Sequence, residues 1–439
     1  MSRAVALRGR DAAPPIPRVT TGLGLLALAL IVSVTAYAAV GLAQRGVVPS
    51  NLAAYSALLA AAFLAGWLAI RRTATGADPV LYPTAAMLSG LGLAMLYRLR
   101  PEVANQQTVW LFIGIVVFVA VLLFIRDDRQ LDAFTYTIGL AGLGLLLLPI
   151  VPGIGYEING ARLWAKIGPL SFQPAELGKI LIVVFLASYL SGKRELLAAG
   201  VGKFGLPRAK DLGPLLLAWS TSLAVLFLEK DLGASLLFFA VFVLMLWVAT
   251  GRAGYLVIGL LLMLVGAVLG YLVFTHVQLR VDYWLHALEP ATIHDVGYGQ
   301  LAQGWFGMAS GGLVGTGLAQ GSPTLIPYVG SDFIFAAFGE ELGMIGASAL
   351  LLLYLVLIGR GLRIALDRTD GFGKLLATGL TTIVALQTFV IVAGVTRLIP
   401  LTGVPLPLVS YGGSSKVATF IILALLVRLS AGPWERSHG

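Results

Sequence analysis

Runs of about 20 apolar residues recur along the chain, and they restrict its fold more than any other feature of the sequence. A run of that length crosses a hydrocarbon core of about 30 Å as a helix. Hydrophobic residues make up 58% of the 439 residues and charged residues only 12%. A water-soluble domain of that composition would expose one continuous apolar surface, so a soluble protein is excluded. The sequence predicts an all-α polytopic membrane protein.

Charged residues, prolines and glycines divide the apolar runs into twelve expected transmembrane helices. These lie near residues 22–42, 52–70, 79–97, 107–125, 134–151, 174–191, 213–229, 232–249, 255–275, 333–359, 373–396 and 417–430. Apolar runs give the existence of such helices more reliably than their ends, so each boundary is expected to shift by a few residues.

Lys and Arg residues are distributed unevenly between the expected loops. If residues 1–20 are cytoplasmic, most basic residues fall on the cytoplasmic side, while the large loop at 276–331 holds only Arg280. This asymmetry predicts that both termini are cytoplasmic and that the large loop faces outside. The net charge of +9 is therefore interpreted as cytoplasmic charge facing anionic membrane lipid, and no nucleic-acid partner is expected.

Cysteine and histidine usage bears on metal and thiol chemistry. The chain has no cysteine, which excludes thiol catalysis and disulfides. It has four histidines, of which His276, His286 and His294 fall in the large loop without the spacing of a known metal motif. Ordinary loop histidines are the preferred interpretation, and no metal-binding residues can be named.

Asp332 stands between the large loop and the apolar segment 333–359. A carboxylate at a membrane boundary is costly unless it has a function or a partner, so Asp332 is a candidate catalytic residue. The alternative is a structural one, because aspartate is a favoured N-terminal cap of helices. Position alone does not decide between these two interpretations.

Two further segments place charges where a lipid-facing helix would avoid them. Glu176 and Lys179 lie three residues apart, so they are neighbours on one helix face and form either a structural ion pair or part of an anion-binding site. Arg162 and Trp164 precede them and favour the binding site. The second segment, the charged turn 229–233, contains Asp231 and has a strong structural explanation, because turns require polar residues.

Two other segments are rich in glycine or proline. Residues 297–317, which contain Gln303, are predicted to form an amphipathic or re-entrant element with backbone open to a ligand, since so many glycines weaken a helix. Residues 396–415 contain three prolines and a Gly-Gly pair, which exclude a regular helix. Irregular backbone at membrane depth survives only beside protein or a water-filled cavity, so this segment is either a binding element or a structural turn.

Together these segments resemble the SEDS (shape, elongation, division and sporulation) family over roughly residues 80–430. The resemblance rests on Asn-Gly-Ala-Arg-x-Trp, Phe-Gln-Pro-x-Glu-x-x-Lys, Asp-Leu-Gly, Ser-Asp-Phe-Ile-Phe-Ala and Pro-Leu-x-Ser-Tyr-Gly-Gly-Ser-Ser, in that order. The forms of residues 229–235 and 397–403 are closest to the RodA branch rather than the FtsW branch. One departure is Ile326–Asp332, where the family commonly has Leu-Pro-Glu-x-His-Thr-Asp. That glutamate and histidine are therefore not required here.

The resemblance implies a division of the chain. Residues 1–20 form a cytoplasmic arm, 21–78 add two helices to the ten of the family, 79–430 form the SEDS glycosyltransferase domain, and 431–439 are a cytoplasmic tail. It also implies an activity, the polymerisation of lipid II into peptidoglycan strands on the outer face of the cytoplasmic membrane, for elongation and rod shape. The alternatives are an FtsW-type division polymerase, a lipid II flippase and, third, a structural scaffold.

On this interpretation Asp332 is the general base. The expected substrate-binding residues are Arg162, Trp164, Gln173, Glu176, Lys179, Asp231, Arg280, Gln303, Glu340, Arg397, Ser410, Ser414, Ser415 and Lys416. A divalent cation, Mg²⁺ or Mn²⁺, could assist the pyrophosphate, and no organic cofactor is expected. The resemblance also implies a partner, a class B penicillin-binding protein that crosslinks the strands, and the lack of a Ser-x-x-Lys transpeptidase domain in this sequence is consistent with that division of labour.

Overall fold

The structure, a computed structural model, describes residues 18–158, 161–168, 170–199, 213, 220, 224, 232–293 and 299–432. Its helices are α1 (Arg18–Arg45), α2 (Leu52–Thr73), α3 (Leu81–Leu99), α4 (Pro101–Phe124), α5 (Arg129–Asp132), α6 (Thr135–Leu147), η1 (Leu148–Ile150), α7 (Pro174–Ala199), α9 (Leu232–Thr250), α10 (Gly254–Val273), α11 (Thr275–Leu285), α12 (Pro290–Ile293), α13 (Gln300–Gly311), η2 (Pro323–Leu325), α14 (Ile334–Asp367), α15 (Gly371–Val395) and α16 (Gly413–Ala431). The strands are β1 (Gly155–Ile158), β2 (Ala161–Ile167) and β3 (Leu170–Phe172).

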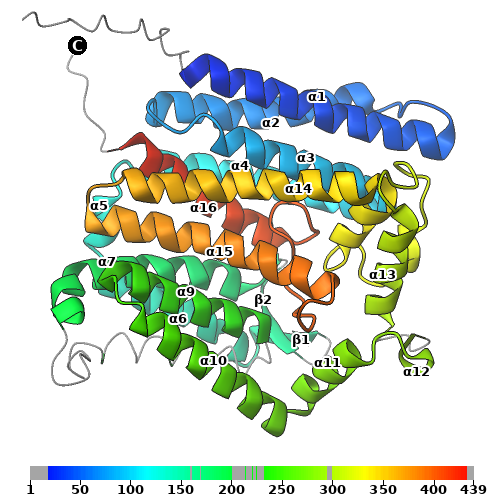
Figure 1. The fold of residues 1–439 in the computed structure, drawn as a ribbon. Coiled ribbons are helices and arrows are strands. Elements are labelled where there is room, and N and C mark those ends of the chain that lie inside the picture. Colours follow the sequence, from blue (N-terminus) through cyan, green and yellow to red (C-terminus); the bar gives the residue numbers. More distant parts are fainter. Residues whose placement is uncertain are drawn as a thin grey trace, which may run out of the picture.

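The long helices run side by side and form a bundle (Figure 1). α1 and α2 cover one flank, where α1 packs mainly on α3 and α2 on α4. The centre is built from α3, α4, α7, α14, α15 and α16, and α10 lies on the opposite flank against α9. α15 shows how the centre forms, since 19 of its 25 residues are buried. Such a helix, apolar all round, must lie inside a larger structure.

Nine helices within the described ranges are long and apolar enough to cross a membrane. They match nine of the twelve predicted spans. The predicted span at 79–97 forms α3 but does not meet this criterion, and that at 134–151 forms the shorter α6 and η1. The predicted helix at 213–229 lies almost wholly outside the described residues. The all-α polytopic class is confirmed, and the span number stays a prediction.

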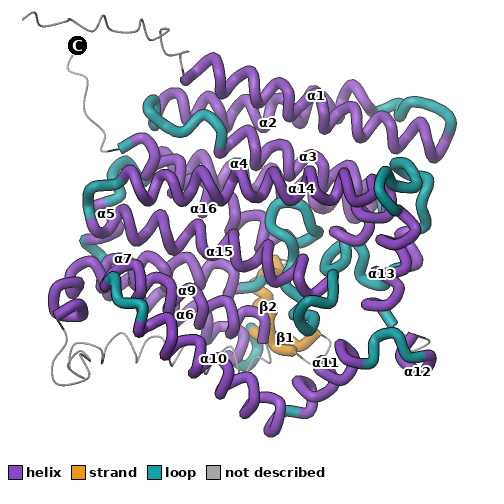
Figure 2. The backbone as a smooth tube through the Cα atoms, in the orientation of Figure 1, coloured by secondary structure: helices purple, strands orange, loops and turns teal. Residues whose placement is uncertain are grey.

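A small antiparallel sheet, ordered β1-β2-β3, interrupts the helical pattern (Figure 2). Tyr156 on β1 pairs with Trp164 on β2, and Ala165 on β2 pairs with Phe172 on β3. We did not predict these strands. Period-two alternation of apolar residues at 163, 165 and 167 was the available signal.

The predicted large loop 276–331 is not a loop throughout, because it contains α11, α12, α13 and η2. These elements gather with the sheet at one end of the bundle, whereas α1 begins and α16 ends at the other end (Figure 1). The prediction that residues 297–317 are too rich in glycine for a stable helix is wrong for α13. Its glycines allow close packing instead: Gly304 lies against the Phe333 ring, and Gly311 lies against the backbone of Gly339.

Candidate functional site

Residues 396–412, named here the proline-rich loop, connect α15 to α16 and have no regular structure. Arg397, Gly403 and Leu408 have positive φ angles of 60°, 75° and 67°. For two non-glycine residues such angles are uncommon, so surrounding contacts must hold them. The prediction of irregular backbone over residues 396–415 is confirmed for 396–412, whereas 413–415 form the first turn of α16.

Asp332 lies beside this loop. A Cβ atom at Gly403 would stand 3.7 Å from Asp332 Oδ2, so the carboxylate faces bare backbone. α14 begins at Ile334, and its N-cap is Phe333 without a side-chain hydrogen bond. Asp332 therefore does not cap α14, and the structural alternative raised for it is wrong.

Burial raises the pKa of Asp332 above its usual value. The Ser331 hydroxyl and the positive charge of Arg280 oppose this effect and stabilise the ionised form. Arg280 also donates from Nη1 to the carbonyl oxygens of Thr402 at 3.1 Å and Leu401 at 3.4 Å. Arg280 thus holds the loop beside Asp332 and supplies positive charge there.

Arg397 connects three elements. Its Nε and Nη2 donate to the carbonyls of Trp284 and Leu285 on α11, at 2.9 and 2.7 Å. Its guanidinium carbon lies 5.7 Å from the ring centroid of Trp305 on α13. The Trp284 indole N–H returns a hydrogen bond to the Arg397 carbonyl at 3.0 Å. Arg397 therefore orders the wall of the site, and its charge lies close to that wall.

Ser410 ties the far end of the loop to Ser331, the residue before Asp332. Its hydroxyl donates to the carbonyl of Ser331 at 2.6 Å and accepts from Leu406 N–H at 3.0 Å. Gln107 on α4 donates to the Ser410 carbonyl at 3.1 Å and accepts from Gly412 N–H at 3.2 Å. We did not predict Gln107, although a fully buried amide within an apolar span was the signal.

Three predicted residues belong to the start of α16. Lys416 is 1% exposed and donates to the Leu408 carbonyl, so it supports the loop from within the protein. Ser414 accepts a hydrogen bond from the Gln173 backbone N–H at 2.8 Å, which joins α16 to the start of α7. Ser415 Oγ is buried and has no hydrogen-bond partner within the described part of the chain.

Glu176 and Lys179 form the predicted pair, at 2.7 Å between Oε2 and Nζ. Both side chains are buried, at 9% and 6% exposed. A buried pair is costly to desolvate and costlier to break, so it is either structural or kept for binding. Lys179 also borders a narrow apolar cavity between α7, α9 and α15. Both interpretations of the pair stay open.

Glu340 and the adjacent Glu341 anchor residues 312–325. Glu340 Oε1 accepts from Ser322 N–H at 2.6 Å, so that oxygen is engaged by the protein's own backbone. Glu341 pairs with Arg98 of α3 at 2.8 Å and accepts from Ala319 N–H at 2.7 Å. We did not predict Arg98 or Glu341. Two adjacent carboxylates in an apolar segment were a signal that partners were needed.

The remaining predicted residues lie apart from this cluster or outside the description. Arg162 is exposed on β2, next to the half-buried Trp164. Gln303 on α13 has a buried side-chain oxygen with no partner among the described residues. Asp231 lies outside the described residues, but Gly233 packs closely against Thr402, which brings the start of α9 to the loop.

The donor groups do not form a complete metal site. Within the described ranges no three His, Cys, Asp or Glu side chains gather so that they could hold an ion. Asp332 offers one carboxylate next to backbone carbonyls. A Mg²⁺ or Mn²⁺ ion there would depend on oxygens of a bound pyrophosphate, which is a usual arrangement for Mg²⁺.

Comparison with known proteins places the chain among cell-wall enzymes. A family model described as cell cycle protein, covering FtsW, RodA and SpoVE, matches residues 82–433. The chain is 45% identical over 435 residues to peptidoglycan glycosyltransferase RodA of Mycobacterium tuberculosis, covering 95% of this chain and 92% of that protein. It is 33% identical to a probable FtsW of Geobacter sulfurreducens, over 80% of this chain and 95% of that protein.

Two solved structures share the fold. One is a chain from a study of how a peptidoglycan synthase complex coordinates polymerization and crosslinking, with a TM-score of 0.68 and 28% identity. The other is rod shape determining protein RodA of Thermus thermophilus, with a TM-score of 0.60 and 27% identity. Each covers 82% of this chain, and 99% and 98% of the respective neighbour is matched.

Proposed function

The chain belongs to the FtsW, RodA and SpoVE family of cell cycle proteins, and from that premise we propose how its residues act in a peptidoglycan glycosyltransferase of the RodA type. The enzyme class follows from its similarity to the RodA proteins, which are much closer in sequence than the FtsW proteins. The roles of individual residues are our proposal.

The reaction joins two lipid II molecules, each a disaccharide pentapeptide on a polyprenyl pyrophosphate. A sugar hydroxyl of the acceptor attacks the anomeric carbon of the donor. The new C–O bond forms as the bond to the pyrophosphate oxygen breaks, and the electron pair leaves with the polyprenyl pyrophosphate. The hydroxyl proton passes to Asp332. A sugar hydroxyl is a very weak acid, so a positioned carboxylate accelerates the step by about 10²–10⁴-fold.

The observation that carries this proposal is the environment of Asp332. Its carboxylate does not cap α14. It faces the backbone of Gly403, where an added Cβ atom would lie 3.7 Å from Asp332 Oδ2. Burial raises its pKa. A raised pKa makes a carboxylate a stronger base, and the charge of Arg280 keeps the ionised form available. Arg280 and Arg397 are the cations on this wall that would stabilise the departing pyrophosphate. Arg162 and the Glu176–Lys179 pair are proposed to extend the anion-binding surface toward α7.

The chain is a multi-pass membrane protein, and we infer that it lies in the cytoplasmic membrane with both termini inside. Support comes from the positive-inside asymmetry and from the position of the start of α14, which directly follows Asp332, at the end of the bundle opposite the start of α1 and the end of α16 (Figure 1). Crosslinking needs a second protein, and a class B penicillin-binding protein is the proposed partner. One structural neighbour belongs to a peptidoglycan synthase complex, which supports this choice.

The decisive experiment uses the full-length protein with its transpeptidase partner, in detergent, and follows labelled lipid II by gel electrophoresis. We expect glycan polymer from the wild type, and a loss of about 10²-fold or more in the Asp332→Asn variant. Asp282→Asn is the matched control, because Asp282 is an exposed carboxylate of α11 whose one ion-pair partner among the described residues is His286. A polymerising Asp332→Asn variant would remove Asp332 as the base. If the wild type moved lipid II across liposomes and never made polymer, the flippase would replace the polymerase.

A further inference from the structure

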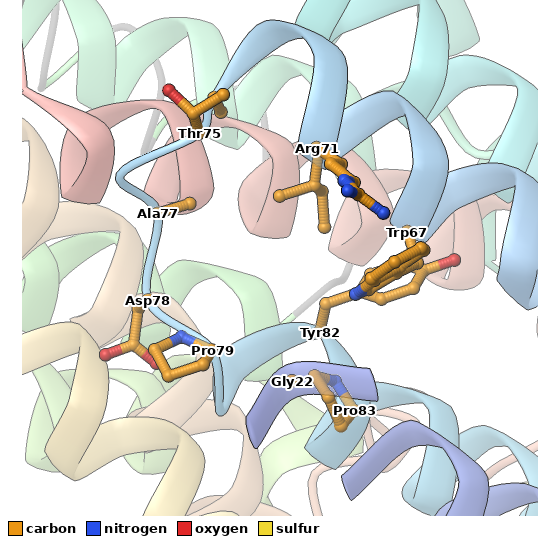
Figure 3. Close-up of a pocket in the computed structure, with 11 residues that line it drawn as sticks. Gly22, Trp67, Arg71, Thr75, Ala77, Asp78, Pro79, Tyr82 and Pro83 are labelled. Atoms are coloured by element: carbon orange, nitrogen blue, oxygen red, sulfur yellow. The ribbon is translucent and has the colours of Figure 1, made fainter. Parts of the chain in front are cut away.

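A cavity of about 170 Å³ lies between α1, α2 and α3, at the end of the bundle where α1 begins and α16 ends. Figure 3 shows Trp67 and Arg71 of α2 on one side, and Asp78 and Pro79 of the α2–α3 connection on the other. Gly22 of α1 also lines the cavity. The polymerase site lies at the opposite end of the bundle, so this cavity is separate from the proposed chemistry.

The α2–α3 connection forms a fixed wall of this cavity. Asp78 Oδ1 accepts from Val80 N–H at 2.9 Å, and Asp78 Oδ2 accepts from Arg360 Nε at 2.7 Å. The Asp78 backbone N–H donates to Ser430 Oγ at 3.0 Å. Among the described residues that line the cavity, Asp78 carries the one carboxylate; Arg360 of α14 neutralises it, and Ser430 of α16 holds its backbone.

Arg71 leaves the cavity with a net positive charge. Its guanidinium carbon lies 5.6 Å from the ring centroid of Trp67, and no carboxylate within 4.0 Å pairs with it among the residues that the structure describes. The carbonyl of Thr73, at the end of α2, accepts a hydrogen bond from Arg428 Nη1 at 2.6 Å. The Arg428 charge thus offsets the negative end of the α2 helix dipole. The charge of Arg71 is thus available to an anion.

The size and place of the cavity restrict that anion. At about 170 Å³ it is smaller than the roughly 300 Å³ of pockets that enclose drug-sized ligands. It is too small for the sugar and peptide of lipid II but suits one phosphate with a short polar group. Its lining is mainly apolar, with Trp67 beside the Arg71 guanidinium and Tyr82 among the lining residues (Figure 3). Aromatic residues with a basic residue at a helix end are typical of the lipid–water interface.

We propose that this cavity binds the phosphate headgroup of an anionic glycerophospholipid, with Arg71 as the phosphate ligand and the lipid tails running along α1 and α2. Guanidinium groups bind phosphate through two parallel hydrogen bonds, and a basic pocket between transmembrane helices fits an anionic headgroup. The lipid would fill the junction between the two N-terminal helices and the rest of the bundle. This site is independent of the proposed glycosyl transfer.

The test titrates the full-length detergent-solubilised protein with short-chain phosphatidylglycerol and counts bound lipid by native mass spectrometry. Arg71→Gln is expected to weaken binding by about ten-fold or more. Arg72→Gln is the matched control, because Arg72 is the exposed neighbour that does not line the cavity. The lipid affinity of this control should fall by at most a few-fold, which is the effect of removing one surface charge.

A second pair of variants tests the cavity without changing charge. A Cβ at Gly22 would meet Pro79 at an ordinary 3.5 Å, so Gly22→Leu is expected to fill the cavity and displace the lipid. Gly24→Leu is its control, since nothing lies within 4 Å of that position. If Arg71→Gln and Arg72→Gln lost lipid affinity equally and Gly22→Leu bound lipid normally, the lipid would be held by diffuse attraction to surface charge. That result would overturn the proposal. Stronger competition by a polyprenyl phosphate, or by inorganic phosphate alone, would overturn the choice of glycerophospholipid.

Discussion

Replacing Arg280 with glutamine separates two roles that one guanidinium can have. In the structure its Nη1 donates to the carbonyls of Thr402 and Leu401, at 3.1 and 3.4 Å. Its charge also lowers the pKa of Asp332 and so opposes the effect of burial. Glutamine retains a hydrogen-bond donor on a shorter side chain and removes the charge. We therefore expect a slower enzyme with a changed pH dependence.

The size of the effect follows from the contacts. One nitrogen serves both carbonyls, so we count a single hydrogen bond from a charged donor, which contributes about 1.5–3 kcal/mol. If all of it served the transition state, kcat would fall by about 10- to 150-fold. Ser410 also holds the loop, through its bonds to Ser331 and Leu406. We therefore expect the lower end, about ten-fold, at a pH where Asp332 is ionised.

The pH profile is the sharper measurement. Losing a nearby positive charge destabilises the ionised carboxylate, so the pKa of Asp332 rises further in the variant. A general base works only when ionised, so activity is lost as the pH falls through that pKa. The acid side of the kcat profile should therefore move to higher pH in Arg280→Gln, measured by lipid II polymerisation with the partner present.

Arg363→Gln is the control for this experiment, because Arg363 is exposed and, within the part of the chain that the structure describes, pairs with Asp367 alone, at 3.3 Å. Its profile should match the wild type. A variant of Arg280 with raised KM, unchanged kcat and an unmoved acid side would refute the reasoning, and would make Arg280 a substrate-binding residue alone.

The remaining predictions concern stability as well as activity. Burial raises the pKa of Asp332, so ionising it costs folding free energy as the pH rises above the ordinary pKa of 3.8. Asp332→Asn should therefore melt higher than wild type near pH 7, and the difference should vanish at about pH 3, below that ordinary pKa. Lys179→Ala should lose activity and about 3–5 kcal/mol of stability, because it leaves Glu176 buried without its partner. The charge-swapped double variant, Glu176→Lys with Lys179→Glu, should regain stability but not activity. Regained activity would make the pair purely structural. Arg98→Ala should destabilise the protein by a similar amount, because it leaves the buried Glu341 carboxylate without its ion-pair partner. It should also speed proteolysis within residues 312–325. Unchanged cleavage there would contradict this anchoring role.

Much of the fold could be predicted from the sequence because membrane helices are local features. Hydropathy over about 20 residues predicts a span without knowledge of its neighbours. α9 shows this, since the predicted 232–249 and the observed Leu232–Thr250 differ by one residue. The short strands β1 to β3 were missed because a few alternating residues near glycines give only a weak pattern.

Assembly of the site depended on contacts that sequence does not contain. Asp332 and the proline-rich loop were both recognisable, as a carboxylate and as irregular backbone at membrane depth. Their proximity in space could not be predicted, because Gly403 lies 71 residues after Asp332 in the sequence (403 − 332). The same holds for Gln107, whose bond to Ser410 joins residues 303 positions apart. Charge and polarity indicate which residues need partners, and only the fold shows which partners they have.

The packing of α3 limits how this protein can be recombined with its relatives. Sixteen of its 19 residues are buried, and close contacts such as Gly90 against the Ser33 side chain join it to α1. The Tyr82 hydroxyl donates to the Phe63 carbonyl of α2 at 3.0 Å. The family match begins only at residue 82, after α1 and α2. A truncated chimera without α1 and α2 would expose Tyr82 and the small residues of α3 to lipid acyl chains. These two helices are therefore an integral part of the packed bundle and cannot be removed as a separate module.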